Sequence, residues 1–109
     1  MFALGAAVIA ACSSGGEPTG STCPEGSTLT YETFGRSFLE THCTKCHSAA
    51  GRGESPALDS VANVRANATS IDSAAAAGPK ATNTEMPEDS DVAEAERRKL
   101  GEWLACGAP

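Results

Sequence analysis

The chain has 109 residues and a formal charge of −6, so it is long enough for one small domain. The acidic charge argues against binding to nucleic acid, because the phosphates would repel it. Apolar residues make up 40% of the chain but aromatic residues only 5%, which indicates a core that needs a disulfide, a metal or a cofactor for stability.

The N-terminus is predicted to be a lipoprotein-type export signal over residues 1–11. Residues 2–11 are all apolar or small, but they are too few to span a bilayer, which takes about 20 residues. No Lys or Arg precedes them, so the signal is either partial or starts further upstream. The run IAAC that ends at Cys12 resembles a lipobox, which predicts cleavage before Cys12 and lipidation of that residue. The alternative is an ordinary signal peptide in which Cys12 is coincidental.

Residues 12–26 are predicted to be a flexible tether. After Cys12 come ten residues of Ser, Gly, Thr, Glu and Pro, a composition that cannot form a core. Such a stretch would reach on the order of 16–19 Å, enough to hold a domain clear of lipid headgroups. We therefore place the folded domain at residues 27–109.

The first helix is predicted over residues 31–41, and no segment of the chain shows the apolar alternation typical of a strand. Thr30 is suited to cap the N-terminus of this helix, and Leu29 with Phe34 has the spacing of a hydrophobic staple. Gly35 lies inside the helix, where glycine costs about 1 kcal/mol relative to alanine. A glycine at that position indicates the close approach of another backbone.

The run Cys43-Thr44-Lys45-Cys46-His47 follows this helix directly and predicts covalent attachment of one haem. In a Cys-x-x-Cys-His motif, two thiols add across the vinyl groups of haem and the adjacent imidazole ligates the iron. The spacing suits this chemistry because residues i, i+3 and i+4 share one side of a helical turn.

The motif has three other possible interpretations. A thioredoxin-like dithiol would need a strand before its helix, which the sequence does not predict. A zinc site could use Cys43, Cys46 and His47, but no second paired cluster completes it. A plain disulfide between Cys43 and Cys46 would leave His47 without a role. Covalent haem is therefore the favoured interpretation.

The middle of the chain is predicted to hold one or two short helices within residues 57–77, which Gly78 and Pro79 end. Residues 79–87 are expected to form an extended loop.

Met86, in that loop, is the predicted sixth ligand of the haem iron. Met1 is lost with the signal, so Met86 is the one methionine left in the mature chain. A neutral thioether suits an electron carrier, since His/Met ligation raises the reduction potential. Pro87 biases Met86 towards an extended backbone. The alternative is that Met86 fills a small core.

The last helix is predicted over residues 91–105. Its first turns are acidic and its later turns basic, as the helix dipole favours, and Glu94 with Arg98 makes an i,i+4 pair. Its apolar face consists of three large residues, Leu100, Trp103 and Leu104.

From about Tyr31 to Cys106 the sequence resembles the class I cytochrome c family, in particular its short bacterial monohaem members. The family places a glycine eight residues and a large apolar residue four residues before the first haem cysteine, here Gly35 and Leu39. Facing them it has an apolar residue and, three residues later, an aromatic residue, here Leu100 and Trp103.

The resemblance implies an all-α, cytochrome c-like fold with three to four helices around one covalently bound haem c, in which the N- and C-terminal helices cross. It also implies axial ligation by His47 and Met86. His42 precedes the attachment turn and is expected to lie at the surface or on the propionate side. Arg52 is a candidate for contact with a haem propionate.

Of the five cysteines, Cys23 and Cys106 remain once Cys12, Cys43 and Cys46 are assigned. They lie just outside the first and last helices, whose ends would meet if the helices cross. An exported protein is in a compartment that permits disulfides, so a Cys23–Cys106 bond is predicted. Two unpaired thiols, or a disulfide to a partner protein, are the alternatives.

Together these features predict a monomeric carrier of single electrons, lipid-anchored on the periplasmic side of a bacterial membrane, that exchanges electrons with redox partner proteins. It would not be an enzyme, since no arrangement of residues suggests a general acid, base or nucleophile. Two alternatives remain. One is a haem-based binder or sensor with a displaceable sixth ligand, and the other is the haem subunit of a larger oxidoreductase.

Overall fold

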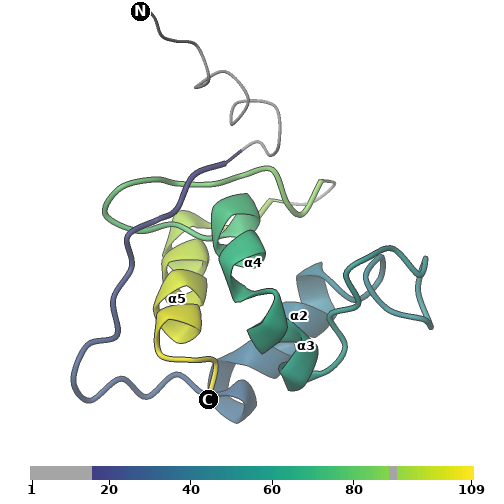
Figure 1. Cartoon of the computed structure of the whole chain (residues 1–109), viewed down its shortest axis with the longest axis horizontal. Helices are drawn as coiled ribbons and strands as arrows, with labels where there is room; N and C mark the ends of the chain where they lie inside the picture. The colour runs from purple at the N-terminus through teal and green to yellow at the C-terminus, as the bar shows by residue number, and fades with distance from the viewer. Residues whose placement is uncertain (1–15, 89–90) are drawn as a thin grey trace, which may run out of the picture.

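The computed structural model describes residues 16–88 and 91–109 (Figure 1). The predicted signal and Cys12 lie outside these residues. The predicted all-α fold is confirmed: the described residues form helices, and their one strand-like pairing is an isolated bridge between Ala77 and Thr82. In chain order the elements are a π-helical turn, η2 (Tyr31–Gly35), and the helices α2 (Arg36–His42), α3 (Val61–Ala66), α4 (Ala68–Ala75) and α5 (Glu94–Ala105).

The first helical region matches its prediction closely. Thr30 caps it as expected: its hydroxyl accepts the backbone N–H of Thr33 at 3.1 Å, and the Thr33 hydroxyl accepts the Thr30 N–H at 2.9 Å. This reciprocal pair satisfies two N–H groups that a helix start leaves without partners. The first turn, η2, is wider than an α-helix and passes directly into α2, which ends at His42.

The middle segment forms two short helices, as predicted, and Asn67 is the break between them. Ser60 caps α3 by accepting the N–H of Asn63. At the other end the Asn67 side chain donates to the Asn63 carbonyl at 2.8 Å. An asparagine that bonds to nearby backbone competes with the helical pattern, which explains why the chain turns here before α4 begins.

Helix α5 starts three residues later than predicted, at Glu94 instead of residue 91. Its first bonds run from the N–H groups of Glu96 and Arg97 to the Ala93 carbonyl, so residues 91–93 precede the helix as an extended lead. The predicted pair of Glu94 and Arg98 is present, at 2.9 Å.

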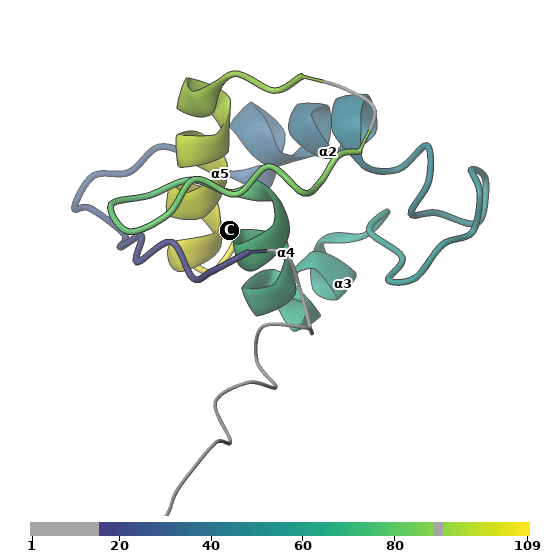
Figure 2. The same cartoon turned by 90° about the horizontal axis from the view of Figure 1, so that it is seen from above.

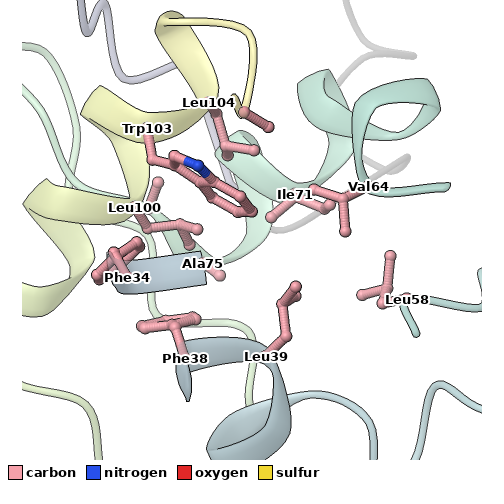
Figure 3. Packing of buried hydrophobic residues seen from close by; sticks show 12 residues of the cluster. Phe34, Phe38, Leu39, Leu58, Val64, Ile71, Ala75, Leu100, Trp103 and Leu104 are labelled. Atoms are coloured by element: carbon pink, nitrogen blue, oxygen red, sulfur yellow. The ribbon is translucent and has the colours of Figure 1, made fainter. Parts of the chain in front are cut away.

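The hydrophobic core lies between η2, α2, α3, α4 and α5, each of which contributes buried side chains (Figure 3). Trp103 is fully buried, and its ring meets that of Phe34 edge-on with 5.9 Å between centroids. A Cβ atom at Gly35 would collide with the Trp103 ring, so glycine is required at this crossing. The close approach predicted from Gly35 is thus confirmed, although it is made by an indole ring and not by another backbone.

The prediction of a flexible tether over residues 12–26 needs correction for residues 16–22. These residues, hereafter the strap, run extended along α4 and the loop that follows it (purple in Figure 1). Thr19 is fully buried, and its N–H and hydroxyl donate to the two carboxylate oxygens of Asp72 at 2.9 and 2.7 Å. The strap has almost no apolar side chains, so polar contacts hold it to the domain and composition alone did not reveal them.

Cys23 and Cys106 form a disulfide with their Cα atoms 4.8 Å apart, the pairing that the sequence analysis favoured. The bond ties the end of the strap to the residue just after α5. It closes a long loop, since 83 positions separate the two cysteines.

Replacing Gly35 with alanine is expected to destabilise the fold by about 1–3 kcal/mol, because the new methyl group overpacks the core. By helix propensity alone, the change from glycine to alanine would stabilise the helix by about 1 kcal/mol. A net loss of stability would therefore identify the collision with Trp103 as the cause. Denaturant unfolding measures the effect, with Ser37→Ala on the exposed side of α2 as the control. Trp103→Phe in the Gly35→Ala background should recover part of the loss, and strict additivity of the two changes would contradict this explanation.

Replacing Cys23 and Cys106 together with serine should lower the free energy of unfolding by roughly 4–5 kcal/mol, because the unfolded chain then loses its cross-link. Thermal and denaturant unfolding with and without reductant measure this loss. A wild-type protein with two reactive thiols before reduction would show that the pairing is absent in solution.

Candidate haem-binding site

The Cys-x-x-Cys-His motif forms a tight turn at the end of α2. The Cys43 carbonyl accepts the N–H of Cys46 at 3.2 Å and that of His47 at 2.9 Å. Both thiols are free, so the plain disulfide between Cys43 and Cys46 does not form here. Cys43 packs against the core cluster, and burial raises the pKa of its thiol to about 11. The two thiols are therefore presented from one turn, as covalent attachment to one group requires.

His47 is held in a defined orientation by the chain that follows it. Its Nδ1 lies 2.9 Å from the Pro56 carbonyl oxygen, and its own carbonyl accepts the N–H of Leu58 at 2.7 Å. A carbonyl can only accept, so Nδ1 carries the hydrogen and Nε2 keeps its lone pair. Such a second hydrogen bond fixes the tautomer and the ring plane of a metal-ligating histidine. The ring is thus prepared to ligate a metal through Nε2.

Both the backbone N–H and the backbone carbonyl of Met86 are hydrogen-bonded. Its N–H donates to the Ala74 carbonyl near the end of α4 at 2.9 Å, and its carbonyl accepts from the Arg97 guanidinium at 2.8 Å. Its half-buried side chain packs against the core cluster. Figure 2 shows the chain after α4 looping out beside α5 and then returning across the molecule. The backbone of Met86 is therefore fixed to α4 and α5.

Arg97 is the residue of this site that the sequence analysis missed. The sequence predicts an exposed basic residue that favours the helix dipole, but Arg97 is only 4% exposed. Its Nη1 lies 2.8–2.9 Å from three backbone carbonyls, those of Ala75, Asn83 and Met86. Burial lowers the pKa of Arg97, although Asp91 opposes that shift. One signal was available: position 97 shares a helical face with Leu100, since the two are three residues apart.

His42 ends α2 beside the motif and is half-buried, with its ring centroid 4.9 Å from that of Phe38. Its Nδ1 is enclosed and has no hydrogen-bond partner among the described residues. Burial lowers the pKa of His42, and the cations Arg97 and Lys45 lower it further. An enclosed polar atom without a partner fits a site that a bound group completes.

Arg52 lies on the loop after the motif and is exposed. It pairs with Glu54 at 3.3 Å, and the surface position of this pair gives it little energetic weight. Its contact with a haem propionate stays a prediction. The zinc alternative gains no support, because residues 16–88 and 91–109 contain no group of three or more metal-binding side chains brought together.

The side chains present fit a covalently attached haem. One turn offers the thiols of Cys43 and Cys46, His47 keeps Nε2 for a metal, and Met86 is anchored on a separate loop.

Comparison with known proteins gives one match. The family model described as Cytochrome c matches residues 34–105, which include the motif, Met86 and the crossing of η2 with α5. Neither the curated proteins nor the solved structures contain a match to this chain.

Replacing Arg97 with methionine is expected to cost about 2–4 kcal/mol of stability, because buried carbonyls lose their donor. Lysine at position 97 should recover part of the loss, since its ammonium keeps the charge and can donate to carbonyls but ends one bond short of Nη1. Arg98→Met is the control: Arg98 is an exposed neighbour, and its loss should change stability by less than about 0.5 kcal/mol. Equal effects of the Arg97→Met and Arg98→Met changes in denaturant unfolding would contradict the assigned role.

Proposed function

Because the chain belongs to the cytochrome c family, whose members bind covalently attached haem c, we propose that it carries single electrons with His47 and Met86 as the two axial ligands. Cys43 and Cys46 hold the haem by thioether bonds. The family supports an electron carrier rather than an enzyme.

The observation that carries this proposal is the fixed placement of both ligand residues. His47 is oriented through the Pro56 carbonyl, and Met86 is held through the Ala74 carbonyl and Arg97. When bound, haem supplies an iron that alternates between the ferrous and ferric states. A neutral imidazole and a neutral thioether need neither gain nor lose a proton in that cycle. Ligands that stay in place keep the reorganisation on electron transfer small.

The fixed backbone around Met86 also favours the carrier over a sensor with a displaceable sixth ligand. Moving the loop away from the iron would break hydrogen bonds, because both backbone groups of Met86 are bonded to α4 and α5. A haem subunit of a larger oxidoreductase would use the same chemistry as a free-standing carrier. The two differ in that the subunit binds a dedicated partner protein.

We further propose that the protein is a monomer anchored through a lipid on Cys12, on the periplasmic side of a bacterial membrane, where it meets its redox partners. The lipobox-like run supports this proposal, as does the Cys23–Cys106 disulfide, which suits an oxidising compartment. No helix in the described part of the chain is long and apolar enough to cross a membrane.

Absorption spectra of the oxidised and reduced protein test the haem assignment and the ligation together. The wild type should show the charge-transfer band of ferric iron bound to a thioether and should react slowly with carbon monoxide. Met86→Ala should abolish the band and lower the reduction potential by on the order of 0.2 V, within the wide range that axial ligands control. Thr84→Ala, at an exposed neighbouring position, should leave both unchanged. A wild type that lacks the band and binds carbon monoxide rapidly would overturn the proposal.

Mass spectrometry of the protein purified from membranes tests the anchor. We expect a chain that begins at Cys12 and carries the added mass of acyl groups, and Cys12→Ser should move the protein to the soluble fraction. A mature chain without acyl mass would refute the lipid anchor and leave the ligation untouched.

A further inference from the structure

Asn83 lies three residues before Met86, and its side chain is hydrogen-bonded to the strap. The Glu17 N–H donates to Asn83 Oδ1 at 3.0 Å, and Asn83 Nδ2 donates to the Glu17 carbonyl at 2.7 Å. Nδ2 also donates to the Asp72 carbonyl at 2.9 Å. The carboxamide therefore binds both backbone groups of Glu17, as a neighbouring strand would, and both its oxygen and its nitrogen are hydrogen-bonded.

The backbone of Asn83 is fixed as well. Its N–H donates to the Ala76 carbonyl and its carbonyl accepts from Arg97, both at 2.9 Å. Asn83 is 5% exposed, while Thr84 and Glu85, which separate it from Met86, are exposed. Asn83 is thus the last buried anchor of the loop before Met86.

A second set of contacts seats the strap at this place. Both carboxylate oxygens of Asp72, on α4, accept from Thr19, and the Thr19 carbonyl accepts the Lys80 N–H at 2.9 Å. A Cβ atom at Gly16 would collide with the Ser73 carbonyl, so the strap also lies directly against α4 there. These contacts join the strap to the same end of α4 whose Ala74 carbonyl holds Met86.

We propose that the strap is a positioning element for the sixth ligand. By holding Asn83 it limits the freedom of the loop that carries Met86, so that loosening the strap favours states in which the Met86 thioether leaves the iron. The strap and Asn83 would act through the loop and would not touch the iron. The inference rests on the ligation proposed above. The strap lies outside residues 34–105, the part of the chain that matches the family model.

Two variants of the full-length, haem-loaded protein test the inference. Asn83→Asp is nearly isosteric but loses both donated bonds and places a carboxylate beside two carbonyls. Thr19→Val keeps the shape of the side chain and loses the hydroxyl that bonds to Asp72. Ser27→Ala is the control, because it removes a hydrogen bond to Glu102, on α5, from the same N-terminal region but away from Asn83.

Two measurements separate positioning from general stabilisation: the rate of carbon monoxide binding to the ferrous protein, and hydrogen exchange at the Met86 amide relative to the Leu39 amide in α2. We expect both Asn83→Asp and Thr19→Val to raise the carbon monoxide rate and the relative exchange of Met86. The rise should be about tenfold, the factor that one lost buried hydrogen bond implies. Ser27→Ala should change neither quantity.

Each outcome decides one question. If the variants speed exchange equally at Met86 and Leu39 and leave the carbon monoxide rate unchanged, the strap only stabilises the fold and the inference is wrong. If Asn83→Asp does not fold, Thr19→Val alone decides. If the wild type itself lacks the thioether band and binds carbon monoxide rapidly, the proposed ligation fails, and that result is distinct from a failure of the strap.

Discussion

The arrangement of this protein depends on the buried guanidinium of Arg97. A permanent cation is costly to remove from water unless strong acceptors surround it, and here three backbone carbonyls do so. Those carbonyls belong to the end of α4 and to the loop before α5. One side chain must form hydrogen bonds to all three carbonyls. This requirement restricts how α4, the loop and α5 can pack against one another. The place of Met86 follows from that restriction.

Helix α5 consequently makes two separate contacts that position other parts of the chain. Near its start Arg97 holds the loop that carries Met86, and six residues later Trp103 packs against Gly35 at the crossing with the first helical region. The two positions are about 9 Å apart along the helix axis. Since α2 leads directly into the motif and α5 holds the loop with Met86, the crossing connects the motif to that loop. A change in the packing of Trp103 would therefore alter more than the stability of the core.

Sequence reasoning recovered the parts of the structure that depend on local patterns. The Thr30 cap, the two short middle helices and the role of Gly35 each follow from a few neighbouring residues or from a family pattern, and the structure contains all three. Arg97 and Asn83 were not recognised, because their partners are backbone carbonyls and peptide groups distant in the chain, which leave no mark on composition. The structure of the strap escapes prediction for the same reason. A segment rich in Ser, Thr and Gly is expected to be flexible, unless buried acceptors such as the Asp72 carboxylate form hydrogen bonds with it.

The docked strap also bears on where the protein can work, given the lipid proposed at Cys12. Only three residues separate Cys12 from Gly16, so the anchor lies within about 14 Å of the point where the strap meets α4. A long free tether would let the domain sample many orientations over a wide area of membrane. A short one keeps a single face near the lipid and gives neighbouring membrane proteins a high effective concentration of the carrier. Electron delivery would then be local, between fixed neighbours, instead of over long distances by diffusion.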